Sequence, residues 1–348
     1  MINIIGWDIG GANTKAAWVA FERGQVSTVR TASRLYEIWR DKEQLSPLLR
    51  DMLAQVTSVP PQAMALTMTA ELSDVFRSKR EGVLFVLESV AAAFPDLPVY
   101  ALCLAGEFVP LAEARTRPLD LAAANWLATA LFVAEQYGDG LLVDIGSTTT
   151  DIIPIQNGRV ACLGRTDLDR LLAGELVYSG LLRTHLAAIV HHVPVRGRSC
   201  PVSAEYFAIS GDVHLILGHI QPADYICPTP DGRPATVEYA RERLARLVCA
   251  DLEMLSAVEV DEMANAIYHQ QMRQIQEAVQ QVLSRLPGHR ELPLVAMGGG
   301  AFLAVQVGQR LGLKVIDWAA HWGHEVSEVA PCLAAAHLLA EQLEAGSH

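Results

Sequence analysis

The sequence of 348 residues lacks the features that mark a membrane protein, a disulfide-rich scaffold or a zinc ribbon. No apolar run reaches the roughly 18 residues that a membrane-spanning helix needs. The first residues contain no basic segment followed by an apolar one, as a secretion signal would. The six cysteines are scattered and form no CxxC pair. We therefore expect reduced thiols in a protein of the cytoplasm.

Basic residues are also scarce. The chain has 27 Lys and Arg against 39 Asp and Glu, which gives a net charge of -12. This balance argues against extended contact with a nucleic acid or an anionic membrane. Any anionic ligand must therefore be bound locally, by a few loops or side chains. With 51% hydrophobic residues the chain is globular, and its length suits two domains of about 150 residues each.

One pattern occurs twice in the chain. Residues 141–155 read LLVDIGSTTTDIIPI, and residues 4–19 read IIGWDIGGANTKAAWV. Each copy is an apolar run, then Asp-Ile-Gly with small polar residues, then a second apolar run. This order predicts a β-hairpin with a glycine-containing turn. Two copies of one hairpin predict two related halves.

In the rest of the chain, segments with the apolar period of a strand alternate with segments that have the period of a helix, which predicts an α/β fold. We expect further strands at residues 24–32, 63–68, 99–104, 292–297 and 314–317, and helices at 38–56, 79–94, 121–137, 237–255, 261–286, 302–311 and 329–343. Residues 228–234 predict an exposed loop with Asp231 at its tip. The predicted domains are residues 1–138, joined by the C-terminal helix 329–345, and residues 139–328, with an insert at about 165–235.

The two hairpin turns carry the chemistry of a phosphate site. A carboxylate, Asp8 or Asp144, ends the first strand of each hairpin and can hold Mg²⁺ or position water. The glycines let backbone N–H groups approach an anion, and polar side chains can hydrogen-bond its oxygens. We expect the two loops to clamp a polyphosphate between the domains. The predicted phosphate-binding residues are Gly10, Gly11, Asn13, Thr14 and Lys15 in the first loop, and Gly146, Ser147, Thr148 and Thr149 in the second.

A triple glycine, Gly298, Gly299 and Gly300, lies between a predicted strand and a predicted helix. This arrangement is typical of a cradle for a phosphate or a nucleoside. A single Asp-x-Gly turn is ordinary hairpin chemistry. Two such turns together with the distal triple glycine favour the ligand-binding interpretation.

These motifs resemble those of a known superfamily. DIGGANTK, DIGSTTTD and MGGGAF are similar to the two phosphate motifs and the adenosine motif of the sugar kinases, actin and heat-shock ATPases. The resemblance covers the whole chain and implies two duplicated actin/sugar-kinase-like domains around a central cleft, with helices 121–137 and 329–343 crossing between them. TAELSDVF, AAANW, GELVYSG, FAISGDVHLILG and TPDGRP resemble the hydantoinase/oxoprolinase-like branch, in particular the aryl-ether-forming synthases of methanofuran or methylofuran biosynthesis.

This resemblance implies an alkyl transferase. The phenol of a tyramine or tyrosine derivative displaces diphosphate from an aminomethylfuran-methyl diphosphate, and an aryl ether forms. The implied partners are these two small molecules, and a homodimer is compatible with the sequence. Mg²⁺ on Asp8 and Asp144 is the expected cofactor, while ATP or ADP can bind but is not required. The alternatives are an ATP-dependent small-molecule kinase or amidohydrolase of the same fold, and a non-catalytic nucleotide sensor.

The phenol must lose a proton whose ordinary pKa is about 10, so a general base is expected. The candidates are Glu71, Asp74, Glu175 and Asp212. We favour Glu71 and Asp74 because their loop follows a predicted strand of the first domain, at a preferred ligand position of α/β folds. The alternatives are that Ser73 or Asp74 caps the next helix, and that Glu175 is a solvated acid.

Several other side chains are candidates for substrate contacts. Asn125 is a poor helix former within a predicted helix, so it either faces the cleft or is a buried amide beside Trp126. Guanidinium groups match carboxylates but also form surface ion pairs. The predicted substrate contacts are Asn125, Glu175, Arg183 and Asp212, with Arg165, Arg243 and Arg246 as further carboxylate-binding candidates. The histidines His191, His192, His321 and His324 lack the acidic or cysteine neighbours of a zinc site.

Overall fold

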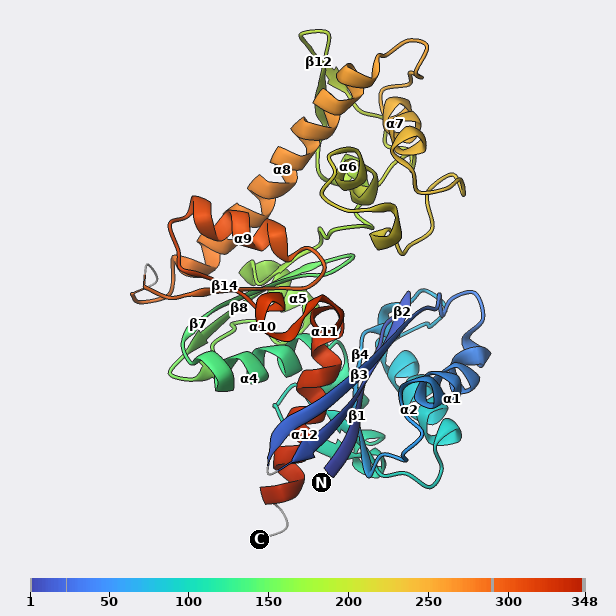
Figure 1. The fold of residues 1–348 in the computed structure, drawn as a ribbon, viewed down its shortest axis with the longest axis vertical. Coiled ribbons are helices and arrows are strands. Elements are labelled where there is room, and N and C mark those ends of the chain that lie inside the picture. The colour runs from blue at the N-terminus through green and yellow to red at the C-terminus, as the bar shows by residue number, and fades with distance from the viewer. Residues whose placement is uncertain (1, 23, 289–290, 346–348) are drawn as a thin grey trace. The chain divides into compact units, whose positions relative to one another are not determined.

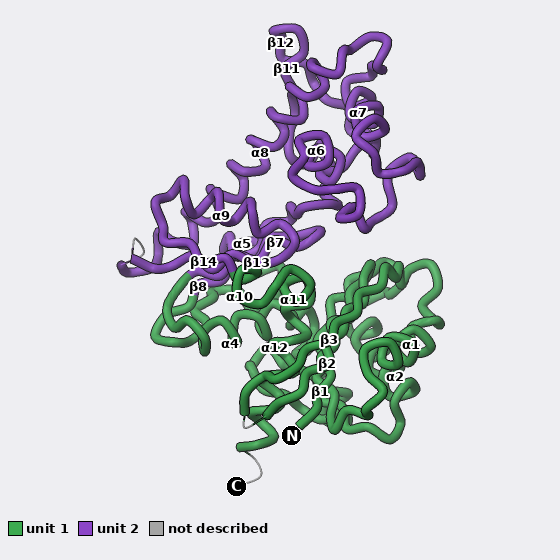
Figure 2. Tube along the Cα trace, in the orientation of Figure 1, with its two compact units in different colours: residues 1–140, 155–169, 318–348 green, residues 141–154, 170–317 purple. Residues whose placement is uncertain are grey.

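A computed structural model describes residues 2–22, 24–288 and 291–345 (Figure 1). The chain divides into two compact units (Figure 2). Unit 1 consists of residues 1–140, 155–169 and 318–348, and unit 2 of residues 141–154 and 170–317. Residues 155–169 and 318–328, which the sequence assigned to the C-terminal domain, thus pack in unit 1. In the part of the chain that the structure describes, no helix is long and apolar enough to cross a membrane.

Unit 1 is built on a six-stranded sheet in the order β3-β2-β1-β4-β5-β6. The first three strands form an antiparallel meander, and β1, β4 and β5 are parallel to one another. Strand β4 is buried along its whole length, as expected where helices cover both faces of a sheet. The strands are β1 (Ile2–Ile9), β2 (Asn13–Glu22), β3 (Gln25–Leu35), β4 (Ala63–Met68), β5 (Val99–Leu102) and β6 (Phe108–Pro110).

Helix α12 packs directly against β1 (Figure 1). A Cβ atom on Gly6 would lie 1.9 Å from the carbonyl oxygen of Cys332, so only glycine permits this approach. Ile5 and Trp7 alternate with Gly6 and join the core formed with α1 and α2. The helices are α1 (Leu45–Val56), α2 (Lys79–Ala93), α3 (Leu111–Ala114), α4 (Asn125–Tyr137), α10 (Ala319–Trp322), α11 (His324–Glu328) and α12 (Ala330–Ala345).

The helix predicted at residues 121–137 begins only at Asn125. Residues Pro118–Leu121 form a short 3-10 helix, and Ala123 has a φ of 51°. A positive φ cannot continue a right-handed helix, so α4 starts after this residue. Asn125 therefore lies in the first helical turn rather than in the interior, where its low helix propensity would cost stability.

Unit 2 repeats this topology. Its sheet has the order β10-β8-β7-β13-β14, in which β7 lies between its hairpin partner β8 and the parallel strand β13. The same relation of a hairpin to two parallel strands occurs in unit 1, so the predicted α/β class and the duplication are confirmed. The strands of this sheet are β7 (Gly140–Ile145), β8 (Thr150–Gln156), β10 (Leu176–Val177), β13 (Leu294–Met297) and β14 (Val315–Asp317). Strand β9 (Arg159–Val160) pairs with β8 and lies among the residues assigned to unit 1.

The long helix α8 and the insert complete unit 2. The helix predicted at residues 237–255 ends at Arg246, and Cys249 beyond it has a φ of 57°. The α-helices are α5 (Asp167–Ala173), α6 (Ser210–Ile216), α7 (Val237–Arg246), α8 (Ala257–Leu283) and α9 (Ala301–Arg310), and a small separate hairpin consists of β11 (His192–Val195) and β12 (Arg198–Pro201).

Candidate active site

The parallel strands β1 and β4 end at the same edge of the unit 1 sheet. The backbone N–H of Thr69 donates to the carbonyl of Ile9 at 2.9 Å, so the two following loops start side by side. A Cβ atom on Gly11 would lie 2.7 Å from Oγ of Ser73. The first phosphate loop, residues 10–13, therefore lies directly against the loop after β4. The sequence predicted this edge as a ligand position.

Asp8 is almost fully buried near the end of β1. It is paired in register with Lys15 on β2 and with Thr67 on β4. Nδ2 of Asn125 donates to Oδ2 of Asp8 at 3.5 Å, so α4 does bring Asn125 to this carboxylate. Oγ1 of Thr14 is buried and has no hydrogen-bond partner among the described residues. A buried hydroxyl normally has a partner, and the predicted phosphate contact of Thr14 stays a prediction.

Lys15 lies on β2 and carries the positive charge of its ammonium group. Its ammonium donates to the carbonyl of Glu328, at the end of α11, at 2.8 Å. This bond uses one of three ammonium hydrogens. The predicted phosphate contact of Lys15 stays a prediction.

Glu71 lies in a 3-10 turn, Ala70–Leu72, directly after β4 and is 2% exposed. Neither carboxylate oxygen has a hydrogen-bond partner among the described residues, and Nζ of Lys79 lies 4.0 Å from Oε1. Burial raises the pKa of Glu71 to about 7, and Lys79 offsets part of this rise. Lys79 also pairs with Asp167 at 2.9 Å, so its charge is shared. A carboxylate with a pKa near 7 is suited to accept a proton at neutral pH.

Asp74, the other favoured base, is exposed three residues further along the chain. The alternative role of Ser73 or Asp74 as the helix cap is wrong, because α2 is capped by Ser78. Oγ of Ser78 accepts a hydrogen bond from the backbone N–H of Glu81. Asp74 is exposed, whereas Glu71 is buried, and this burial raises the pKa of Glu71.

The second phosphate loop, residues 146–149, lies in unit 2. It closes on itself through a 2.9 Å bond from the N–H of Gly146 to the carbonyl of Thr149. The chain after β10 packs along it, since the N–H of Arg183 donates to the carbonyl of Ser147 at 3.0 Å. A Cβ atom on Gly180 would lie 2.6 Å from the backbone of Thr148. The structure therefore brings the backbone of Arg183 to this loop, along with Gly180, which the sequence prediction missed. The predicted substrate contact of the Arg183 side chain stays a prediction.

The triple glycine also meets this loop region. The N–H of Gly300 donates to the carbonyl of Ile145 at 2.9 Å, and Gly298 has a φ of +83°. A Cβ atom on Gly298 would lie 2.4 Å from Oδ1 of Asp144. The turn thus places backbone atoms against the Asp144 carboxylate, which no residue with a side chain would allow.

We expect the Gly298→Ala variant to lose about 2–4 kcal/mol of unfolding free energy, because the methyl group meets Asp144 and the backbone requires a positive φ. Gly312→Ala is the matched control, since Gly312 has a φ of +69° and open space around its Cβ position. It should lose only about 1 kcal/mol. Denaturant unfolding measures both values, and equal losses would contradict a role for the contact with Asp144.

Two predicted substrate contacts are instead held in buried networks of unit 2. Glu175 is fully buried and pairs with Arg285. Asp212 is fully buried and accepts hydrogen bonds from Nε and Nη2 of Arg243 at 2.9 and 2.7 Å. Burial raises the pKa of Asp212, and Arg243 offsets part of the rise. Both acids are therefore paired with arginines inside the protein, and Glu175 is not the solvated acid considered as an alternative.

Arg243 and Arg246, two of the further carboxylate-binding candidates, are similarly occupied. Asp231, predicted at the tip of an exposed loop, pairs with Arg233, Arg243 and Arg246 at 2.8, 3.1 and 3.3 Å. These hydrogen bonds and charges hold the pKa of Asp231 at about 2, against the effect of its burial. Arg243 and Arg246 therefore bind a carboxylate of the protein itself.

Comparisons with known proteins agree with this architecture. The family model described as hydantoinase/oxoprolinase matches residues 62–342. The chain is 38% identical over 344 residues to (4-{4-[2-(gamma-L-glutamylamino)ethyl]phenoxymethyl}furan-2-yl)methanamine synthase of Methanocaldococcus jannaschii, covering 99% of both chains. A protein of the same name from Methanococcus vannielii is 35% identical over 207 residues, 59% of this chain and 92% of that protein.

A solved structure shares the fold. Nucleotide-free acetone carboxylase aligns with 96% of this chain and 70% of its own, with a TM-score of 0.57 and 12% sequence identity. At this identity the likeness concerns the fold alone. The match of the family model and the similarity to the M. jannaschii synthase over nearly the whole chain lead to one conclusion: this protein is a member of the hydantoinase/oxoprolinase family.

Proposed function

We propose that this protein joins the phenol oxygen of a tyramine or tyrosine derivative to an aminomethylfuran-methyl diphosphate and releases diphosphate, in the biosynthesis of methanofuran or methylofuran. The observation that carries the proposal is the 38% identity, over 99% of both chains, to the M. jannaschii synthase. The product in that synthase's name contains a phenoxymethyl group on a furan, which is an aryl ether. The proposed function makes the same kind of bond.

In the proposed reaction, the phenol oxygen attacks the methylene carbon of the furan-methyl group. The carbon–oxygen bond to diphosphate breaks, and diphosphate leaves with the electron pair. The phenolic proton passes to a general base, for which we propose Glu71. Its buried carboxylate and its pKa of about 7 support this role, because a base must be ionised at the working pH and still basic enough to accept a proton.

The leaving diphosphate carries several negative charges, so its stabilisation is the second requirement. In unit 1, the proposed donors are the backbone of residues 10–13, the Thr14 hydroxyl and Lys15. In unit 2, they are the backbone of residues 146–149 and the Ser147 hydroxyl, which is buried without a hydrogen-bond partner among the described residues. Buried hydroxyls of this kind support a role in binding an anion.

Mg²⁺ fits the residues at both loops. Asp8 and Asp144 are each the last residue but one of a strand. Their carboxylates are the hard oxygen ligands that Mg²⁺ prefers, and the glycine-containing loops follow directly. When bound, the ion would neutralise part of the diphosphate charge and so make it a better leaving group. ATP or ADP can occupy the same phosphate loops in this proposal, but the reaction does not consume it.

The test is an assay with the purified protein, Mg²⁺, the furan-methyl diphosphate and a phenol donor. We expect one diphosphate per ether formed, measured by a phosphate assay coupled to pyrophosphatase and by mass spectrometry of the ether. Tyramine, glutamyltyramine and tyrosine, tested separately, would identify the donor. Omitting the phenol should abolish ether formation. A kinase or an amidohydrolase would be favoured instead if the protein released ADP from ATP with an added substrate. In that case it should also release no diphosphate from the furan compound.

A further inference from the structure

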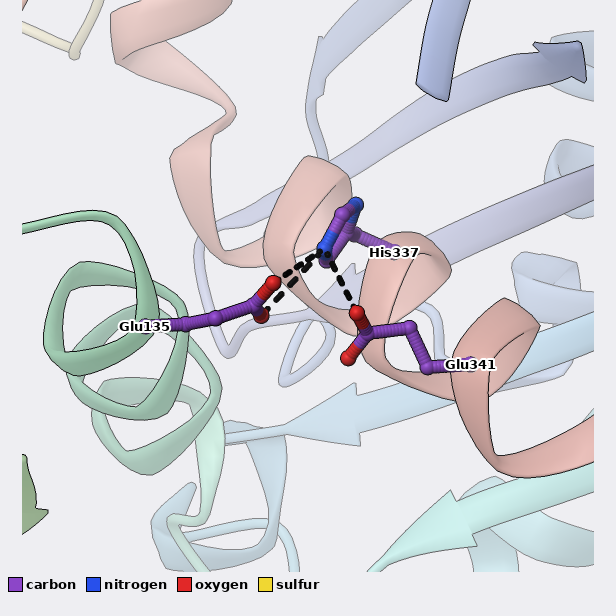
Figure 3. Close-up of side chains that lie close together, drawn as sticks. All are labelled: Glu135, His337 and Glu341. Atoms are coloured by element: carbon purple, nitrogen blue, oxygen red, sulfur yellow. Dashed lines mark hydrogen bonds and ion pairs between the residues drawn. The ribbon is translucent and has the colours of Figure 1, made fainter. Parts of the chain in front are cut away.

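A histidine and two glutamates meet on the surface of unit 1 (Figure 3). Glu135 comes from α4, while His337 and Glu341 lie four residues apart on α12. This spacing places the last two on one face of the helix. One potential ligand atom from each of the three residues lies within 4.8 Å of the other two. Figure 3 shows the three side chains pointing toward one another.

The distances in this group are long for hydrogen bonds between charged groups. Nε2 of His337 lies 3.4 and 3.3 Å from the two carboxylate oxygens of Glu135, and 3.5 Å from Oε1 of Glu341. A charge-assisted N–H···O bond is about 2.7–2.9 Å long. Two ligand atoms that share a tetrahedral zinc ion, with bonds of about 2.0–2.1 Å, lie about 3.3–3.4 Å apart. The distances from Nε2 to the two carboxylates are therefore close to the separation of neighbouring zinc ligands.

Burial and charge also favour a cation here. His337 is 7% exposed, and its ring packs edge-on against Phe132 with the centroids 4.9 Å apart. The ring is thus held in place with Nε2 directed at the carboxylates. The two glutamates are exposed, so an ion can reach the group from solvent. Two neighbouring carboxylates repel each other unless a cation lies between them.

We propose that Glu135, His337 and Glu341 bind a divalent transition metal ion of the zinc type, with water in the remaining position. Imidazole nitrogen with carboxylate oxygen is a donor set that suits zinc, whereas Mg²⁺ and Ca²⁺ prefer oxygen ligands alone. The ion would join α4 to α12, two helices that pack together but are separated by about 200 residues of sequence. The site is independent of the proposed aryl-ether synthesis.

The test uses the full chain, freed of metal with a chelator and titrated with zinc chloride alone. We expect one zinc ion per chain by calorimetry and by elemental analysis after gel filtration. Bound zinc at about 100 times its Kd should raise the thermal midpoint by about 5 °C or more. Cobalt in place of zinc should give the visible absorption of a tetrahedral Co²⁺ ion. Magnesium chloride at the same concentration should not shift the midpoint through this group.

The variants Glu135→Gln, Glu341→Gln and His337→Gln should each weaken zinc binding by about 10- to 100-fold or more. The matched control is Glu344→Gln, which removes an exposed carboxylate from the same helix and should bind zinc as the unmodified chain does. Glu135→Gln and Glu341→Gln alter exposed side chains, so they keep the test valid if His337→Gln fails to fold. Absence of zinc binding, or equal binding by all the variants, would overturn the proposal.

Discussion

Replacing Glu71 by glutamine is expected to lower kcat by about 10²- to 10⁴-fold, the usual contribution of a general base, and at the same time to stabilise the folded protein. Glutamine resembles the protonated form of this side chain in shape and charge. It cannot accept the phenolic proton, but it also avoids the cost of a buried carboxylate that has no hydrogen-bond partner among the described residues. A loss of activity caused by misfolding would have the opposite effect on stability.

The sign of the stability change follows from the pKa of Glu71, which burial raises from 4.5 to about 7. Between these two values the folded protein binds more protons at Glu71 than the unfolded chain does. Stability therefore falls as the pH rises through this range, and the cost is complete above pH 7. At about 1.4 kcal/mol per pH unit it amounts to about 3 kcal/mol. Glu71→Gln should recover this energy at pH 8 and very little at pH 4.5, as measured by denaturant unfolding.

The pH dependence of the rate offers a second measurement on the same variant. Because the base must be ionised, kcat/KM should fall about tenfold per pH unit below pH 7 and level off above it. This fall in kcat/KM below pH 7 should be missing from the residual activity of Glu71→Gln. Asp74→Asn, an exposed carboxylate in the same loop, is the comparison. If Asp74→Asn reduced the rate more than Glu71→Gln, the assignment of Glu71 as the base would be wrong.

The second large effect is expected for Asp8→Asn and Asp144→Asn, tested one at a time. Each should lower kcat by at least about 10²- to 10³-fold, the loss seen when one stabilising group for a developing charge is removed. Asparagine has the same shape, so the fold should persist by circular dichroism and thermal unfolding. A weaker apparent affinity for Mg²⁺ in the assay would support the role of these carboxylates as ligands.

Asp120→Asn is the control for these variants, because Asp120 is an exposed carboxylate in a 3-10 helix of unit 1. It should change neither the rate nor the dependence on Mg²⁺. If Asp8→Asn and Asp144→Asn behaved like this control, the Asp-Ile-Gly hairpins would be structural features only, and the proposed stabilisation of diphosphate would be refuted.

Much of the architecture could be predicted from local patterns. The two hairpins, the buried strand β4 and the helix after the triple glycine each follow from the period of apolar residues and from turn residues nearby in the chain. The repetition of Asp-Ile-Gly then predicted the duplication that the two sheets display. Errors occurred at helix ends, as at Asn125, where the backbone conformation of a single alanine decides the start of α4.

The environments of individual acids could not be predicted in this way. Glu71, Glu175 and Asp212 are all carboxylates in irregular or helical segments, and sequence alone could not rank them. Only the packed structure leaves Glu71 buried without a hydrogen bond among the described residues, while it gives Glu175 and Asp212 arginine partners. Burial and long-range ion pairs depend on residues that are far apart in the chain, and a single sequence does not reveal those contacts.

The proposed metal-binding group, Glu135, His337 and Glu341, likewise depends partly on local sequence and partly on tertiary contacts. The sequence determined that His337 and Glu341 share a helix face, because a spacing of four residues is a local property of helices. It also determined the two phosphate loops, since glycine and an acid in a tight turn are adjacent along the chain. The tertiary structure alone brought Glu135 on α4 to His337, and Asn125 to Asp8. The physical reason is that apolar packing of α12 against α4 and β1 determines which distant side chains meet.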